Sequence, residues 1–355
     1  MNKKILVAMS GGVDSAVAAL LLKKDGYDIG GITMRVWSDG EELDDSDTTL
    51  PDQNCVDAKL ITDALGIPHH TVSLGKSFRE KVINKFIEEY RLGSTPNPCV
   101  ECNKHIKFGK LFDEAVRLGY NALATGHYAR IVCDENGRYT LRKAADDKKD
   151  QSYFLWSIDK SLLPNIIFPL GSLTKPEIRK IAADNGFSNA HRSDSQDICF
   201  IENGDYVSFI KSVSSTDQKK GNFIDLEGNK IGEHTGIINY TIGQRKGLGV
   251  AFGKPMFVGN KNVNDNTVTL CTDEQLYRDT LVAHSINLLT DETFERPVRL
   301  YAKIRYRHTP AIATVVKTAE GLLSVKFDLP QRAIAPGQSL VLYDGDIVVG
   351  GGIIA

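Results

Sequence analysis

The chain has 355 residues, and its 43 Lys and Arg nearly balance its 45 Asp and Glu, for a formal net charge of −2. This balance neither supports nor excludes a nucleic-acid partner, which would need local basic patches rather than a basic whole. No run of about 18 apolar residues occurs, which excludes a membrane-spanning helix, and the N-terminus lacks the pattern of a signal peptide. We expect a cytoplasmic protein with two or three domains and no membrane partner.

The N-terminal segment carries the most informative motif. Residues 5–9 predict a buried strand, residues 16–24 predict a helix, and Ser10-Gly11-Gly12-Val13-Asp14-Ser15 joins the two. Glycines let backbone N–H groups approach an anion, and the start of a helix adds the positive end of its dipole. Asp14 is suited to orient a donor or to hold Mg²⁺ through water. The motif lacks the Lys-Ser/Thr pair of a Walker A loop. The alternative is an ordinary strand-to-helix turn that binds nothing.

Strands and helices alternate through residues 1–204, which predicts a doubly wound parallel α/β sheet. We expect strands at 28–34, 69–72 and 121–129 and helices at 56–65, 78–90, 104–118 and from Thr174 to about 185. Thr174 and Glu177 have the spacing of a helix capping box. The acidic residues 38–52 suggest a surface loop, and residues 134–137 suggest a hairpin turn.

The character of the chain changes near residue 205. Glycine-rich turns and short strands predict a small central domain over residues 205–280. From there to residue 355 we expect a small β-barrel, because alternating Val- and Ile-rich segments at 298–306, 311–316, 322–327 and 339–343 are separated by turn signals.

Six cysteines in a long chain without a signal peptide do not suggest a disulfide scaffold. Cys99 and Cys102 form a CxxC pair just before the helix at 104–118, where the helix N-terminus is expected to lower a thiol pKa. If the segment containing Cys199 meets this pair, the three thiols form one site. A lone CxxC can also be half of a zinc site or a chance pair. The remaining thiols, Cys55, Cys133 and Cys271, are expected to be small core or surface residues.

Seven segments in order along the chain together resemble the bacterial tRNA-specific 2-thiouridylase family. They are residues 8–15, TPNPCVECNKHIKF at 95–108, ATGHY at 124–128, KDQSYFL at 149–155, DICFI at 197–201, YTIGQRKGLG at 240–249 and RYR at 305–307. The resemblance implies a PP-loop ATP pyrophosphatase domain, a central tRNA-binding domain and a C-terminal β-barrel. It implies that ATP, with Mg²⁺, adenylates the wobble uridine of tRNA at its 2-oxygen. Sulfur then displaces AMP to give 2-thiouridine.

The same resemblance implies roles for individual residues. The nucleotide site comprises Ala8, Met9, Ser10, Gly11, Gly12, Val13, Asp14, Ser15, Met34 and Gly126. The flipped target base meets Asn97, Pro98 and Cys99, and further tRNA contacts are His127, Lys149, Asp150, Gln151, Arg305, Tyr306 and Gln338. We expect Arg305 and Arg307 to share one face of a strand. The implied partners are tRNAs for Lys, Glu and Gln and a sulfur-donor protein or sulfide source.

Two mechanisms for the sulfur step remain open. In the first, Cys199 accepts sulfur as a persulfide and attacks the activated base, and Cys102 releases the product by forming a disulfide with Cys199. In the second, Cys99, Cys102 and Cys199 hold a [4Fe–4S] cluster whose open iron binds sulfide. Family members often carry Asp at the position of Cys99, and this departure favours the cluster.

Two alternative functions would not require the cysteine trio. One is another PP-loop ligase or synthetase that adenylates a small molecule, and the other is a nucleotide-binding regulatory module without chemistry.

Overall fold

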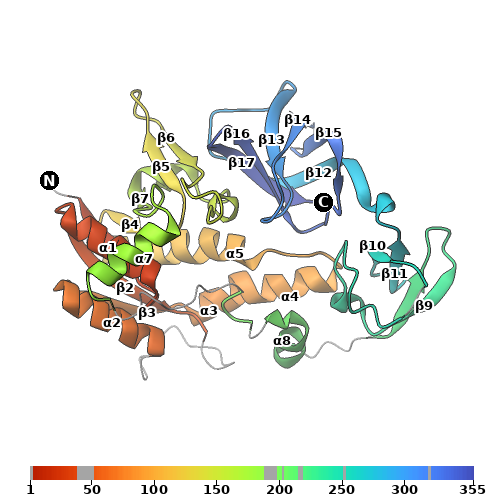
Figure 1. The fold of residues 1–355 in the computed structure, drawn as a ribbon, viewed down its shortest axis with the longest axis horizontal. Coiled ribbons are helices and arrows are strands. Elements are labelled where there is room, and N and C mark those ends of the chain that lie inside the picture. The colour runs from red at the N-terminus through yellow and green to blue at the C-terminus, as the bar shows by residue number, and fades with distance from the viewer. Residues whose placement is uncertain are drawn as a thin grey trace.

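The computed structural model describes residues 3–37, 52–187, 198–201, 204–214, 219–250, 253–318 and 321–355. The expected acidic loop lies outside these residues except for Asp52, and so does the segment 188–197 that precedes Cys199. Figure 1 shows three regions: a sheet-and-helix unit that contains the N-terminus, a small β unit that contains β9 and β10, and a barrel that contains the C-terminus.

The N-terminal sheet is parallel throughout and has the order β3-β2-β1-β4-β7. Its strands are β1 (Lys4–Ala8), β2 (Asp28–Arg35), β3 (His69–Ser73), β4 (Ala122–Ala124) and β7 (Ile166–Ile167). β1 lies between β2 and β4 and is parallel to both. Its carboxyl end therefore lies near the middle of the end of the sheet at which the parallel strands terminate. The predicted doubly wound α/β fold is confirmed.

Two helical layers cover the sheet, one on each face. Successive side chains of β1 point to opposite faces, and both faces are apolar. Ile5 and Val7 join a core with α1 (Val13–Lys24), α2 (Gln53–Leu65) and α7 (Lys175–Asp184). Leu6 joins the core on the other face. That layer has two continuous helical runs, α3 (Gly75–Phe78), η1 (Arg79–Ile83) and α4 (Asn84–Arg91), then α5 (Pro98–Glu101), η2 (Cys102–Lys110) and α6 (Leu111–Arg117).

The second run begins six residues before the helix predicted at 104–118. The reason is local: the Asn97 side chain accepts a hydrogen bond from the Cys99 N–H at 3.2 Å, and Pro98 occupies the first turn. The middle segments η1 and η2 are π-helical rather than α-helical. The predicted capping box is present, with Thr174 and Glu177 closing the start of α7.

The strand expected at 121–129 is wrong in length, because the chain leaves the sheet after Ala124. It then forms the predicted hairpin, β5 (Arg130–Cys133) and β6 (Tyr139–Arg142). Arg142 pairs with Ile347 of the barrel. Asp346 lies 2.9 Å from the Arg130 guanidinium and 3.5 Å from that of Arg142. The hairpin therefore fastens the barrel to the N-terminal unit (Figure 1).

The barrel is closed and antiparallel. It comprises β12 (Tyr277–Leu288), β13 (Val298–Lys303), β14 (Ala311–Lys317), β15 (Leu323–Arg332), β16 (Ser339–Asp344) and β17 (Ile347–Ile354), with β12 pairing to β17. The sequence predicted four of these strands and missed β12 and β17. The expectation that Arg305 and Arg307 share a strand face is wrong, since β13 ends at Lys303 and a turn follows.

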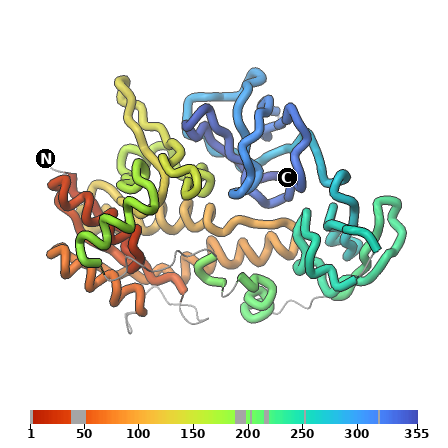
Figure 2. Tube along the Cα trace, viewed as in Figure 1, coloured from red at the N-terminus to blue at the C-terminus, as the bar shows by residue number. Residues whose placement is uncertain are grey.

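The central unit is a four-stranded sheet in the order β10-β11-β8-β9. In Figure 2 its chain, coloured green to cyan, lies at the opposite end of the molecule from the N-terminus. Its strands are β8 (Gly221–Ile224), β9 (Lys230–His234), β10 (Phe257–Asn262) and β11 (Thr267–Cys271), and α8 (Tyr206–Val213) precedes them. The short helices elsewhere are η3 (Ser152–Phe154), η4 (Lys160–Asn165), η6 (Ile237–Asn239) and η7 (Glu274–Leu276).

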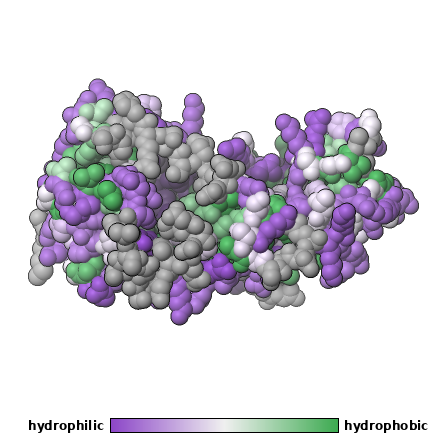
Figure 3. Space-filling view, turned by 90° about the horizontal axis from the view of Figure 1, so that it is seen from below, coloured by the Kyte–Doolittle hydropathy of each residue, from purple (hydrophilic) through white to green (hydrophobic). Residues whose placement is uncertain are grey.

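On the face shown in Figure 3, the coloured atoms are mostly hydrophilic, and apolar ones gather only in limited patches. Within the described ranges, no helix combines the length and the apolar character that crossing a bilayer requires.

Candidate functional site

The glycine loop, residues 9–15, leads from β1 into α1 at the carboxyl edge of the sheet. Gly11 has φ +71°, and a Cβ there would lie 2.8 Å from the Asp57 Cβ, so only glycine fits. Gly12 is the N-cap of α1 and supplies no side-chain cap, so this end leaves backbone N–H groups for an anion.

Two serine hydroxyls hold the loop in shape. The Ser15 hydroxyl donates to the Gly12 carbonyl at 3.1 Å and accepts from the Ser10 N–H at 3.2 Å. The Ser10 hydroxyl lies 3.3 Å from that of Ser15. Ser15 is buried, whereas Ser10 is exposed. Ser15 therefore has a structural part in the loop, and Ser10 is the hydroxyl that a ligand can reach.

Asp14 is held by two residues that the sequence analysis did not single out. The Lys175 ammonium lies 2.7 and 2.9 Å from its carboxylate oxygens, and the Tyr128 hydroxyl donates to it at 2.7 Å. Lys175 is 7% exposed, at the first position of α7. The Asp14 side chain remains about a third accessible. It can therefore still hold Mg²⁺ through water, in competition with Lys175. Lys175 lies within the predicted capping box, and Tyr128 is the last residue of the ATGHY motif. These two motifs were the only indications in the sequence that the two residues matter.

Two further predicted nucleotide contacts lie beside the loop. Gly126 follows β4, and a Cβ on it would lie 3.1 Å from the Asp14 Cβ and carbonyl carbon and from the Ser15 nitrogen. Met34 is on β2 near its carboxyl end, partly buried against the same core as Ala8. Met9 and Val13 are buried in the core on the opposite face. The predicted nucleotide residues thus gather at one edge of the sheet, as ligand sites of open α/β sheets do.

The three thiols come from segments about 100 residues apart and lie close enough to influence one another. As whole residues Cys99 and Cys199 are exposed and Cys102 is buried, but protein atoms pack around all three sulfurs. Burial among protein atoms raises the pKa of Cys99 to about 11 and that of Cys102 to about 12, and it also raises the pKa of Cys199. Negative charge on Cys199 raises the other two further. The expectation that a helix N-terminus lowers the pKa of the thiols of the CxxC pair, Cys99 and Cys102, is wrong, because desolvation is the larger effect.

One cation opposes this rise. Lys107, on η2, lowers the pKa of all three thiols. Its ammonium lies 3.3 Å from Nε2 of His127, whose Nδ1 lies 2.6 Å from the Thr125 hydroxyl. Thr125, Gly126 and His127 are consecutive, so one short segment contacts the glycine loop and the cation near the thiols. Lys107 was not among the predicted site residues, because a spacing of five residues from Cys102 matches no α-helical contact.

The fit of this site to a metal cluster is poor. In the part of the chain that the structure describes, no group of three or more His, Cys, Asp or Glu side chains is arranged to hold a metal ion.

Among the predicted tRNA contacts on the barrel, Gln338 contacts the segment that leads into the CxxC pair. It donates to the Thr95 carbonyl at 2.7 Å, and a Cβ on the adjacent Gly337 would lie 2.9 Å from the Thr95 nitrogen. Asn97 and Pro98 line a cavity of about 40 Å³ against barrel residues that include Gly337. This cavity is too small for a pyrimidine base, so it is not by itself the base pocket.

Several other predicted tRNA contacts are engaged within the protein. Asp150 is buried and accepts hydrogen bonds from Ala144 N–H and from the Ser152 hydroxyl. The Gln151 amide oxygen accepts from the Tyr128 N–H at 2.9 Å, and the partly buried Lys149 precedes it.

Arg305 and Tyr306 lie in the turn after β13. Arg305 donates to the Arg332 carbonyl at 3.0 Å. The ring of Tyr306 lies 4.5 Å from that of Phe154, which brings the barrel turn to the segment that follows Gln151.

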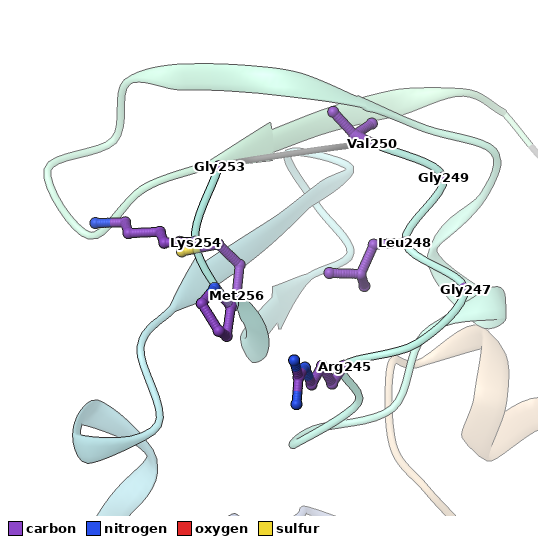
Figure 4. A pocket seen from close by; sticks show the side chains of 9 residues that line it. Arg245, Gly247, Leu248, Gly249, Val250, Gly253, Lys254 and Met256 are labelled. Carbon is purple, nitrogen blue, oxygen red and sulfur yellow. The ribbon is translucent and has the colours of Figure 1, made fainter.

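A larger hollow of about 470 Å³ lies in the central unit, away from the glycine loop (Figures 1 and 4). Arg245, Leu248, Lys254 and Met256 are among its lining residues, and Figure 4 shows both cationic side chains beside it. Its size does not make it the reaction site, because no thiol or glycine-loop residue lines it.

Comparisons with known proteins cover nearly the whole chain. Three family models match in order: a tRNA methyl transferase HUP domain at residues 3–203, a tRNA methyl transferase PRC-barrel domain at 208–272 and an aminomethyltransferase beta-barrel domain at 278–354. Among solved structures, a 4-thiouridine synthetase–RNA complex with bound ATP is 19% identical, covering 59% of this chain and 50% of its own, with a TM-score of 0.34. That likeness is too weak to bear on function.

Curated relatives match much more strongly. The protein named tRNA-specific 2-thiouridylase MnmA from Clostridioides difficile is 46% identical over 355 residues, covering 100% of this chain and 98% of its own. The protein of the same name from Acetivibrio thermocellus is 44% identical over 360 residues, covering 99% of each chain. Identity at this level, from end to end, means that the chain belongs to the tRNA-specific 2-thiouridylase family.

Proposed function

We propose that this protein uses ATP to adenylate the 2-oxygen of the wobble uridine of tRNA and replaces that oxygen with sulfur. The observation that carries the proposal is the segment Thr125-Gly126-His127, which packs against the glycine loop at Gly126 and contacts Lys107, near the thiols, at His127. A nucleotide on the loop and a sulfur on Cys102 or Cys199 would therefore serve one reaction centre. The relatives' names point to the same reaction.

The activation step needs a bound triphosphate and a positioned base. The free N–H groups at the start of α1 and the Ser10 hydroxyl suit the phosphates, and Mg²⁺, held through water by Asp14, would supply charge neutralisation. Met34 and Gly126 border the place for adenosine. The uridine 2-oxygen attacks the α-phosphorus, and pyrophosphate leaves. The base oxygen thereby becomes part of AMP, a far better leaving group.

For the sulfur step we favour the persulfide route, because the cysteine trio fits a cluster poorly. A donor protein of the persulfide class transfers its outer sulfur to Cys199. That outer sulfur attacks C2 of the base, and AMP leaves with the C2–O bond electrons. Cys102 then attacks Sγ of Cys199. A Cys102–Cys199 disulfide forms, and the electron pair of the broken S–S bond stays on the base sulfur. An external thiol reduces the disulfide before the next turnover.

The remaining parts of the proposal concern the partners and the domains. Asn97, Pro98 and Cys99 receive the everted base. The surrounding tRNA surface is formed by His127, Lys149, Asp150, Gln151, Arg305, Tyr306 and Gln338. This requires His127, Asp150 and Arg305 to exchange their present partners or to act through them. We assign residues 1–204 to catalysis, 205–280 to tRNA binding and 281–355 to the barrel. The substrates are tRNAs for Lys, Glu and Gln, and the compartment is the cytoplasm, where they occur.

The test is tRNA-dependent pyrophosphate release and 2-thiouridine formation with a persulfide donor. Cys199→Ala should abolish thiolation and leave pyrophosphate release intact, whereas Cys133→Ala, at an exposed hairpin cysteine, should change neither. Pyrophosphate release with a small-molecule acceptor but not with tRNA would refute the proposal in favour of another ligase. Iron bound stoichiometrically after anaerobic purification, and required for thiolation, would refute the persulfide route in favour of the cluster.

A further inference from the structure

The helix that carries Cys102 is π-helical over η2, and this changes which residues share a face. Its hydrogen bonds join residues five apart, as in the bond from the Leu111 N–H to the Ile106 carbonyl. In an α-helix, side chains five residues apart point about 140° away from each other. In the π-helical turn, whose hydrogen bond joins residues five apart, they lie on the same side of the helix. Lys107, five residues after Cys102, is thereby brought to the face on which Cys102 lies.

The Lys107 side chain is fixed by a defined contact. An ammonium group only donates hydrogen bonds, so Nε2 of His127 accepts from it at 3.3 Å. His127 then carries its proton on Nδ1 and donates to the Thr125 hydroxyl at 2.6 Å. The imidazole ring packs against both Phe108 and Phe168, with centroids 5.9 and 5.8 Å away. Burial lowers the pKa of His127 well below its usual range, so this partner stays neutral and leaves the charge of Lys107 uncancelled.

The charge of Lys107 has an evident target. Its positive charge lowers the pKa of Cys99, Cys102 and Cys199. At Cys102, this lowering of the pKa is larger than the rise caused by either neighbouring thiol. In the described part of the chain, the hydrogen-bonding partner of its side chain is His127. A lysine that served only as a solvated surface charge would not be held by a half-buried, neutral histidine beside three thiols.

We propose that Lys107 is a positioning residue of the sulfur-transfer step: held by His127 one π-turn from Cys102, its ammonium stabilises the sulfur anions that form on Cys102 and on the Cys199 persulfide. This inference rests on the proposed function. Negative charge passes from Cys102 sulfur to the thiolated base during disulfide formation, and Lys107 remains beside it at both ends of the step. No atom is exchanged with Lys107, which acts by charge alone. Adenylation at the glycine loop does not require it.

The test separates the two half-reactions in Lys107→Met, Lys107→Gln and Lys107→Arg. Lys110→Met, at an exposed lysine on the same helix, is the matched control. For both neutral variants we expect tRNA-dependent pyrophosphate release within about twofold of wild type and single-turnover thiolation slower by about 10²-fold, the scale of losing one preorganised electrostatic group. Lys107→Arg should recover much of the thiolation rate, and Lys110→Met should match wild type.

Three results would overturn the inference. Thiolation by both neutral variants at the wild-type rate would show that the charge is not used. Equal losses of pyrophosphate release and thiolation would assign Lys107 to tRNA or ATP binding instead. Thiolation that Lys107→Arg does not recover would show that the shape of the lysine, rather than its charge, is needed. Failure of the wild-type protein to thiolate any tRNA is a different outcome, because it refutes the proposed function itself.

Discussion

Gly126 is the residue whose substitution tests the geometry of the glycine loop most directly. A Cβ at this position would lie 3.1 Å from three atoms at the start of α1, two of them backbone. Backbone cannot rotate away as a side-chain tip can, so Gly126→Ala must displace α1 or β4 by a few tenths of an ångström. Overpacking of this kind costs about 1–3 kcal/mol, and the reduced entropy of the unfolded chain offsets about 0.4–1 kcal/mol.

The net expectation for Gly126→Ala is a loss of about 1–2 kcal/mol. For a unit of about 200 residues this lowers the melting temperature by roughly 2–8 °C. The control is Gly232→Ala on β9, where the nearest atom is 3.5 Å away and no positive φ is required, so melting should be unchanged or slightly higher. The measurement is thermal melting with and without ATP, combined with ATP titration calorimetry.

ATP affinity should fall in Gly126→Ala by more than stability does, because the displaced atoms frame the anion site. The reasoning would be refuted if the variant melted and bound ATP as wild type does. A drop in melting temperature with unchanged ATP affinity would show that the loop does not depend on this contact, even though the packing does.

Three further predictions follow from single contacts. Gly11→Ala combines a strained φ of +71° with a clash, so soluble protein should melt lower and lose ATP binding in calorimetry. Burial raises the pKa of Cys102 to about 12, so this thiol stays protonated from pH 6 to 9. At pH 8, iodoacetamide should therefore modify Cys102 roughly a hundred-fold or more slowly in the folded chain than in the unfolded chain. Fast modification of Cys102 in the folded chain would contradict this prediction. Gln338→Ala removes the contact to Thr95 and should raise the tRNA KM a few-fold with unchanged kcat, and a fall in kcat alone would argue against it.

The sequence predicted local features well where one residue dictates the backbone. The glycine loop, the capping box at Thr174, the hairpin at 134–137 and the parallel sheet each follow from residue types at fixed spacings. The helix start at Asn97 was missed, although Asn followed by Pro is a local signal for it. The strand expected through Ala129 was too long, because apolar content alone does not reveal where a chain leaves a sheet.

The candidate site was predictable as a set of residues but not as an arrangement. Lys175 and Tyr128 hold Asp14 through contacts 161 and 114 residues apart, and no spacing in the sequence indicates them. The thiol pKa values went the opposite way to the expectation, since burial depends on what packs around a sulfur and not on its place along a helix.

The sequence by itself determined the family, the parallel sheet, the anion loop and the three cysteines, because these depend on local backbone preferences and on long shared strings. Only the tertiary structure decided that one segment, residues 125–127, contacts both the loop and the cation near the thiols, and that a π-helical turn aligns Lys107 with Cys102. Contacts between distant segments arise from packing, whose energy is spread over many residues, and no single position in the chain records them.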